Sequence, residues 1–184
     1  MFEAVNMAAL WKLPAIYMCE NNMYGMGTSI DRSSSNTKFY TRGQVVPGFK
    51  IDGQNVFHVR ESMKFAKNYA IENGPFFIEV STYRYHGHSM SDPGTTYRTR
   101  EEVQRFRKEH DPIEKVRDII LKHSFATEKE LKDIEKNIRK EITDDVEKIK
   151  KDPMPDEKNM YQYVYQEPQL IRGVEYNQNI MSTI

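Results

Sequence analysis

Apolar runs in the first half of the chain alternate with polar, glycine-containing segments. Residues 2–13 are good helix formers with apolar groups on most sides, and Pro14 stops the run, so we predict a buried helix there. The apolar residues 15–19 lead into a polar segment at Glu20, as a buried parallel strand does when it enters a loop. Residues 75–80 repeat this pattern and predict a second buried strand.

Helical patterns occupy much of the remaining chain. Residues 60–72 carry apolar groups at helical spacing, and the following Asn73 and Gly74 are typical of a helix end. Three later helix starts have side-chain caps, namely Thr99 with Glu102, Asp111 with Pro112, and Thr127 with Glu130. The last helix is expected to end at Asp152–Pro153 and has one apolar stripe, formed by Leu131, Ile134, Ile138, Ile142, Val146 and Ile149.

The order helix, strand, helix, strand, then helices is typical of half of a doubly wound α/β domain. We expect that domain over residues 1–98, a helical extension over 99–152 and an irregular tail over 153–184, which is rich in Pro, Gln and Tyr. Ligands of such parallel sheets lie outside the carboxyl ends of the strands. The loops that follow Cys19 and Val80 leave from those ends, so both can address one site.

Composition excludes several classes of partner. Lys and Arg together number 27 and equal Asp and Glu, so no net charge favours nucleic acid or an anionic membrane surface. No apolar run approaches the roughly 20 residues that cross a bilayer, and we expect no membrane insertion. Cys19 is the single cysteine, which rules out an intrachain disulfide and favours a reducing compartment. The first 13 residues carry no visible targeting signal.

The first polar loop, ENNMYGMGTS at residues 20–29, has the composition of a binding segment. A carboxamide oxygen and a backbone carbonyl are suitable ligands for Mg²⁺, and Gly25 and Gly27 allow close approach of the backbone to a ligand. The alternative is an ordinary turn in which Asn and Gly supply left-handed conformations.

The second polar loop, TYRYHGHSMSDPGTTYR at residues 82–98, places Arg84, His86 and His88 two residues apart. If this segment is extended, the three side chains share one side and form a cationic surface suited to an anion such as a diphosphate. The alternatives are a metal site or a solvated loop with incidental histidines. The isolated histidines at positions 58, 110 and 123 are expected to be structural or exposed.

The two loops together resemble the family of pyruvate dehydrogenase alpha subunits, of mitochondrial type. The resemblance covers residues 2 to about 172 and includes FEAVNMAALWKLP, ENNMYGMGTS, the IDG at 51–53, TYRYHGHSMSDPG and YRTREEV. Alpha subunits of branched-chain 2-oxo acid dehydrogenases match less well, because their first loop usually lacks the YGMGTS ending.

This resemblance implies the C-terminal half of a thiamine diphosphate-binding domain in an enzyme of the mitochondrial matrix. The implied reaction is the oxidative decarboxylation of pyruvate with reductive acetylation of lipoyl groups. The implied site comprises Asn22 and Tyr24, which bind Mg²⁺ through side chain and backbone carbonyl respectively, Gly25 and Met26 against the cofactor, and the catalytic-site residues Arg84 and His88 near its diphosphate and the entrance.

Regulation and partners are implied in the same way. Ser89, Thr96 and Ser29 match three phosphorylation positions of the family, although Thr96 replaces the usual Ser, which puts kinase control there in doubt. The implied partners are a beta subunit in a heterotetramer, the lipoyl-bearing dihydrolipoamide acetyltransferase, and a pyruvate dehydrogenase kinase and phosphatase.

One departure from the family pattern concerns the metal. The family's cofactor motif opens with a Gly-Asp-Gly whose Asp is the charged metal ligand, and the 20 residues before Asn21 are fewer than its spacing requires. We therefore expect that the chain alone does not hold the cofactor. An alternative is a truncated, non-catalytic relative that serves as a structural subunit of a mitochondrial assembly.

Overall fold

A computed structural model of the chain describes residues 1–42, 44–156 and 159. The chain divides into two compact units, Met1–Ala126 and a second that begins at Thr127, and each is described by itself. The domain boundaries predicted at residues 98 and 152 remain predictions.

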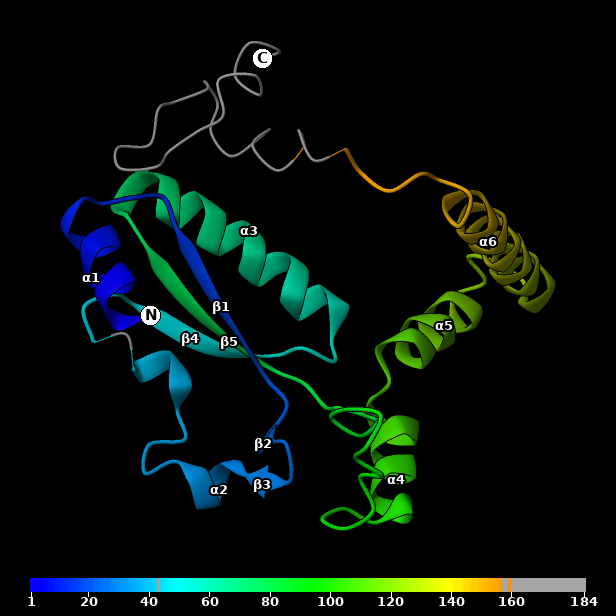
Figure 1. Ribbon diagram of the computed structural model, residues 1–184, viewed down its shortest axis with the longest axis horizontal. Coiled ribbons are helices and arrows are strands. Elements are labelled where there is room, and N and C mark those ends of the chain that lie inside the picture. The colour runs from blue at the N-terminus through cyan, green and yellow to red at the C-terminus, as the bar shows by residue number, and fades with distance from the viewer. Residues whose placement is uncertain (43, 157–158, 160–184) are drawn as a thin grey trace. The chain divides into compact units, whose positions relative to one another are not determined.

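A three-stranded parallel sheet organises the first unit (Figure 1). It consists of β1 (Ile16–Asn21), β4 (Gly48–Asp52) and β5 (Phe76–Ser81), in the spatial order β1-β5-β4. Asn21, Ser81 and Asp52 are register partners at the carboxyl ends of their strands, so these ends lie level with one another. A small antiparallel pair, β2 (Tyr24–Gly25) and β3 (Thr28–Ser29), follows β1.

The parallel α/β fold predicted from the sequence is confirmed, but strand β4 was missed. The sequence pattern placed residues 48–52 in the connection between the first strand and the following helix. The segment is an edge strand that contributes Phe49 and Ile51 to the core beneath α3 and leaves Lys50 exposed. A strand of five residues with only one apolar face gives a weak local signal.

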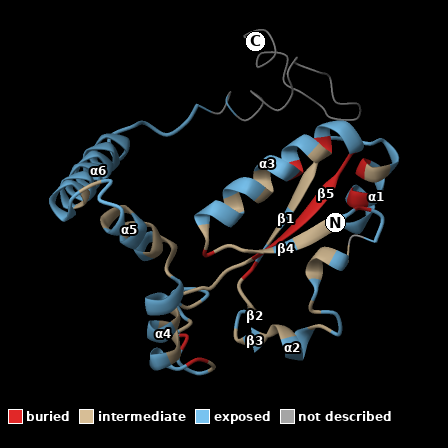
Figure 2. Cartoon of the chain, turned by 180° about the vertical axis from the view of Figure 1, so that it is seen from behind, coloured by how far each residue is buried: buried red, intermediate tan, exposed pale blue. Residues whose placement is uncertain are grey.

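Helices cover both faces of the sheet. Helix α3 (Val56–Asn73) packs through Ala66, Met63 and Tyr69 against Phe76, Ile78 and Val80 of β5. Helix α1 (Phe2–Leu10) lies on the other face, where Val5 forms a second cluster with Val46 and Phe77. Alternate residues of β5 therefore serve opposite cores, and β5 is the most deeply buried strand (Figure 2).

The prediction of a buried N-terminal helix was wrong for this unit. Only Val5 and Ala8 of α1 are buried, whereas Phe2, Leu10 and Trp11 are 56%, 75% and 59% exposed. Among the described residues, the sheet covers one side of this helix, and the apolar side chains on its other sides are exposed. The helix ends at Leu10, before Pro14, and Lys12 adopts a positive φ of 50°.

The predicted start of α3 at residue 60 was wrong. The helix begins four residues earlier, at Val56, because the side chain of Asn55 accepts hydrogen bonds from the amides of Phe57 and His58.

The predicted caps are confirmed. Gly74, with φ of 101°, ends this helix. The side chains of Thr99 and Asp111 cap α4 (Arg100–His110) and α5 (Pro112–Lys122). Two short helices, α2 (Ile30–Ser33) and η1 (Phe39–Thr41), lie between β3 and β4.

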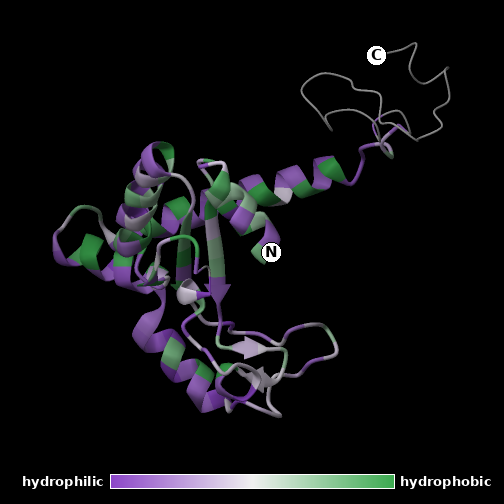
Figure 3. Cartoon of the chain, turned by 90° about the vertical axis from the view of Figure 1, so that its left-hand side faces the viewer, coloured by the Kyte–Doolittle hydropathy of each residue, from purple (hydrophilic) through white to green (hydrophobic). Residues whose placement is uncertain are grey.

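The second unit contains α6 (Glu128–Ile149), which begins with a capping box formed by Thr127 and Glu130. The predicted apolar stripe is visible along this helix (Figure 3), and Ile134, Ile142 and Ile149 are exposed. None of the described helices is long and apolar enough to cross a membrane. Residues 153–156 form no helix or strand, and the rest of the predicted irregular tail, apart from residue 159, lies outside the described residues.

Candidate functional site

Two asparagines shape the loop at the carboxyl end of β1. Asn21 is 5% exposed, and its Oδ1 accepts a hydrogen bond from the Met23 amide at 3.0 Å. Asn22 Oδ1 accepts one from the Tyr24 amide, also at 3.0 Å. Met23 lies between these acceptors with a φ of 68°. The side-chain oxygen of Asn22 is thereby held in a fixed direction and keeps a second lone pair.

The two glycines of this loop have different surroundings. A Cβ on Gly27 would lie 3.0 Å from Tyr97 Cδ1, so the second loop packs directly on this glycine. A Cβ on Gly25 would meet nothing within 4 Å, and Gly25 and Met26 are both exposed. Gly25 therefore lies at an open surface of the loop, where a ligand can approach.

Arg84 joins the two loops. Its Nη2 donates hydrogen bonds to the carbonyl of Met26 at 2.7 Å and to the hydroxyl of Tyr97 at 2.9 Å. The rings of Tyr24 and Tyr97 also lie close, with centroids 5.5 Å apart. The expectation that both loops lie together at the carboxyl ends of the strands is confirmed.

The sequence predicted that Arg84, His86 and His88 share one cationic side if their segment is extended. That condition is not met. Residues 82–88 do not form a strand, and the Arg84 guanidinium points into the contact between the loops, where its Nε also donates to the carbonyl of His86 at 3.2 Å. His86 and His88 are exposed. Roles for Arg84 and His88 toward a diphosphate stay predictions.

Asp92 closes the second loop on itself. Its carboxylate accepts hydrogen bonds from the amide of His88 at 2.7 Å, the hydroxyl of Tyr97 at 2.6 Å and the amide of Gly94 at 2.8 Å. These donors, the His88 amide foremost, lower the pKa of Asp92 from 3.8 to about 2. Gly87 is required beside it, because a Cβ there would lie 1.8 Å from the Asp92 carbonyl oxygen.

Arg98 holds the backbone of the second loop and was not identified from the sequence. It is 4% exposed, donates to the backbone carbonyls of Arg84 and His86, and has its guanidinium 5.2 to 5.5 Å from the ring centroids of three tyrosines. Those rings belong to Tyr24, Tyr83 and Tyr97. Several tyrosines near an arginine give the only sequence signal, and such a signal has low specificity.

Glu79 was also missed, although a charged residue inside the apolar run of residues 75–80 is a clear signal. It lies in the middle of β5 with no exposed surface. Its carboxylate accepts a hydrogen bond from Asn21 Nδ2 at 2.8 Å. Glu79 thus connects the central strand with the loop that begins at Asn21.

The remaining predicted residues are accessible to different degrees. Ser89 and Thr96 are exposed, and Ser89 Oγ lies 3.0 Å from Ser91 Oγ, whereas Ser29 is half-buried before α2. The three isolated histidines, His58, His110 and His123, are exposed, as expected.

The donor set for a cation is partial. Asn22 Oδ1 and the Tyr24 carbonyl are neutral oxygens of the kind that Mg²⁺ accepts alongside a carboxylate. Among the described residues no group of three or more His, Cys, Asp or Glu side chains could hold a metal ion. The first loop therefore offers two neutral oxygens of this kind, and their role toward Mg²⁺ stays a prediction.

Comparison with known proteins assigns the family. The family model described as "Dehydrogenase E1 component" matches residues 1–158. The chain is 57% identical over 165 residues to "Pyruvate dehydrogenase E1 component subunit alpha-1, mitochondrial" of Oryza sativa subsp. japonica, which covers 90% of this chain and 42% of the relative. It is 51% identical over 177 residues to the mitochondrial E1 component subunit alpha of Dictyostelium discoideum, covering 96% and 47%.

A probable pyruvate dehydrogenase E1 component subunit alpha of Caenorhabditis elegans is 48% identical over 184 residues, covering 98% of this chain and 46% of the relative. The chain thus spans less than half the length of these relatives. Since the family model matches 158 of the 184 residues, and the joined loops lie where ligands of parallel sheets bind, this chain belongs to the dehydrogenase E1 component family.

Proposed function

We propose that this chain forms part of the alpha subunit of a pyruvate dehydrogenase (acetyl-transferring). The proposed reaction is the thiamine diphosphate-dependent oxidative decarboxylation of pyruvate, followed by reductive acetylation of lipoyl groups. One observation carries the proposal: two loops joined by Arg84 lie at the carboxyl ends of adjacent parallel strands. They do so in a chain 48% to 57% identical to pyruvate dehydrogenase alpha subunits over most of its length.

The residues of the first loop have distinct proposed roles. Asn22, through its side chain, and Tyr24, through its carbonyl, are the proposed Mg²⁺ ligands, and Gly25 and Met26 line the cofactor. The fixed direction of Asn22 Oδ1 and the open surface at Gly25 support these assignments. When bound, thiamine diphosphate supplies the electron sink for decarboxylation, and the protein supplies orientation and an environment that excludes water.

The second loop has proposed roles in cofactor contact and regulation. Arg84 and His88 are proposed to face the diphosphate side of the site and its entrance. Phosphorylation is proposed at Ser89, Thr96 and Ser29, of which Ser89 and Thr96 are already exposed to a kinase.

The proposed setting follows from the relatives. Those named above are mitochondrial E1 alpha subunits, so we place this protein in the mitochondrial matrix. Its proposed partners are a beta subunit, the lipoyl-bearing dihydrolipoamide acetyltransferase, and a regulatory kinase and phosphatase. The two neutral ligands proposed in the first loop are consistent with a cofactor site completed by other segments.

Substitution of Asn22 by Ala in the full-length protein, in its native assembly, tests the proposal. We expect the thiamine diphosphate concentration for half-saturation at limiting Mg²⁺ to rise at least roughly tenfold, because a metal ligand is lost from a loop rather than from the core. Calorimetric titration measures this value. Asn68→Ala, on an exposed position of α3, is the matched control. An unchanged cofactor requirement in Asn22→Ala would remove Asn22 from the metal site.

A further inference from the structure

Glu79 is a buried carboxylate at the centre of the sheet. It has no exposed surface, and its register partners are Cys19 of β1 and Lys50 of β4. Its side chain lies on the α1 face of the sheet, because Phe77, two residues before it, belongs to the core cluster with Val5. An apolar residue at this position would serve packing equally well. A buried charge therefore requires another explanation.

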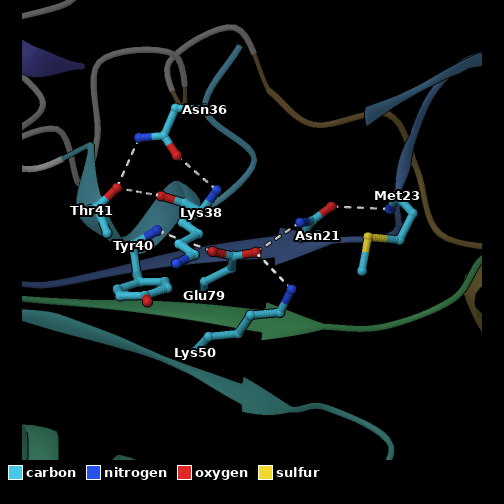
Figure 4. Close-up of polar contacts among 8 residues, drawn as sticks. All are labelled: Asn21, Met23, Asn36, Lys38, Tyr40, Thr41, Lys50 and Glu79. Atoms are coloured by element: carbon cyan, nitrogen blue, oxygen red, sulfur yellow. Dashed lines mark hydrogen bonds and ion pairs between the residues drawn. The ribbon is translucent and has the colours of Figure 1, made fainter. Parts of the chain in front are cut away.

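Three groups from three different elements converge on this carboxylate (Figure 4). Glu79 Oε1 accepts from Asn21 Nδ2 at 2.8 Å and lies 3.4 Å from Lys50 Nζ. Glu79 Oε2 accepts from the backbone amide of Tyr40, in η1, at 3.1 Å. The Lys50 side chain is 39% exposed, so the ion pair reaches the surface at one end only.

Asn21 transmits this arrangement to the first loop. While its Nδ2 donates to Glu79, its Oδ1 accepts from the Met23 amide at 3.0 Å. Both ends of the carboxamide are therefore used, which fixes its rotation. Asn22 lies between the two anchored positions, so its backbone direction depends on the Asn21 side chain. Met23, with φ of 68°, holds an unfavourable conformation that this hydrogen bond supports.

We propose that Glu79 is a positioning residue, which orients Asn21 and thereby sets the direction of the Asn22 side chain toward a bound cation. The inference rests on the proposed function, since it concerns the same magnesium site. Glu79 itself does not contact the cation. Groups that orient metal ligands in this way typically change metal affinity roughly 10–100-fold when they are removed.

Two substitutions interrupt the connection at different points. Glu79→Gln keeps the shape of the side chain but has one acceptor oxygen where the carboxylate has two. Its NH₂ group therefore faces the donor of either Asn21 or Tyr40, and that hydrogen bond is lost. Asn21→Ala removes the carboxamide that links Glu79 to Met23. If both act through one path, the double variant should show no larger effect on the cation than Asn21→Ala alone.

Lys50→Met is the matched control. It removes the third partner of Glu79 and so weakens the same buried network, but it leaves the hydrogen bond between Glu79 and Asn21 intact. A residue with a merely structural role would lower the melting temperature in all of these variants without changing cation affinity. If Glu79 has a positioning role, Glu79→Gln and Asn21→Ala weaken cation binding, whereas Lys50→Met lowers only the melting temperature.

The measurement is the Mg²⁺ concentration for half-maximal binding of thiamine diphosphate, by calorimetry, to the full-length protein in its native assembly. We expect an increase of roughly tenfold or more in Glu79→Gln and Asn21→Ala. In Lys50→Met we expect a change of less than about twofold despite a lower melting temperature. If Glu79→Gln does not assemble, Asn21→Ala decides by itself, because it breaks the same link.

The outcomes separate this inference from the proposed function. If the unsubstituted protein binds thiamine diphosphate with Mg²⁺ and Asn22→Ala weakens that binding, the proposed function stands. In that case unchanged Mg²⁺ dependence in Glu79→Gln, or in Asn21→Ala, overturns the positioning role. If the unsubstituted protein shows no Mg²⁺-dependent binding of the cofactor, the proposed function fails and this inference fails with it.

Discussion

Asp92 shows how one side chain determines the form of a loop. Its carboxylate accepts two backbone amides, from His88 and Gly94, and the Tyr97 hydroxyl. Tyr97 in turn accepts from Arg84, which reaches the first loop at Met26. The charge on Asp92 therefore affects both loops.

The lowered pKa of Asp92 predicts how the stability of the second loop depends on pH. The folded-state pKa lies at about 2, below the ordinary value of 3.8, so the carboxylate stabilises the loop fully above 3.8 and loses that contribution as pH falls toward 2. We expect a titration midpoint near 2 for Asp92, measured by ¹³C NMR with aspartate labelling. Tyr97→Phe, which removes one donor, should raise the midpoint toward the ordinary value. A midpoint near 3.8 in the unsubstituted protein would contradict this account.

At the scale of elements, the second loop depends on few anchors. Arg98 holds the carbonyls of Arg84 and His86, and Asp92 holds the amides of His88 and Gly94. Between these anchors, Ser89 and Met90 are exposed, and the Ser89 hydroxyl lies at hydrogen-bonding distance from the Ser91 hydroxyl. The exposed tip at Ser89 and Met90 can therefore change conformation while Tyr83, which contacts Glu102 and Phe106 of α4, keeps the start of the loop in place.

Ser89→Glu tests this separation between loop and fold. A carboxylate at position 89 adds negative charge near Asp92 and competes with the partners of the Arg84 guanidinium, as a phosphate would more strongly. In the full-length protein, assembled with its proposed beta partner, we expect loss of most overall activity and faster proteolysis between residues 85 and 98. The melting temperature without cofactor should stay near that of the unsubstituted protein.

Ser89→Ala is the control for that variant, since it removes the contact with Ser91 without adding charge. It should retain the original cleavage pattern. Full activity and unchanged proteolysis in Ser89→Glu would show that the loop does not respond to charge at this position.

At the scale of the whole molecule, the proposed magnesium site has ligands of one kind only. The chain spans 42% to 47% of the length of its relatives, and the two ligands proposed in the first loop are neutral oxygens. Mg²⁺ gives up its water reluctantly and requires anionic ligands from the protein or the cofactor in a fixed array. In the proposed site, the charged ligand and the further contacts of the cofactor are expected from other segments.

The 184-residue chain by itself is therefore expected to show no saturable binding of thiamine diphosphate with Mg²⁺ at micromolar cofactor. Calorimetric titration of the chain measures this, with the full-length assembly as the positive control. Tight binding by the chain alone would show that the two neutral ligands suffice, and our account of the site would then be wrong.

The sequence by itself determined the elements whose signals are local. The caps at Thr99, Asp111 and Thr127 and the helix end at Gly74 depend on hydrogen bonds within a few residues, so their residue types predict them directly. The strands β1 and β5 are apolar runs long enough to be read without a partner. The two polar loops were identified because they follow those strands, and the motifs in them indicated the family.

Only the tertiary structure decided how distant residues combine. Strand β4 forms because β5 offers it a register and a core, which its own five residues do not reveal. Helix α1 carries apolar side chains that the first unit leaves exposed, since burial depends on what else packs there. Arg84 donates to the carbonyl of Met26, Arg98 contacts three tyrosine rings, and Glu79 accepts from Asn21, 58 residues away in sequence. Such contacts depend on where the strands and loops lie in space, and spacing along the chain does not specify which residues pair.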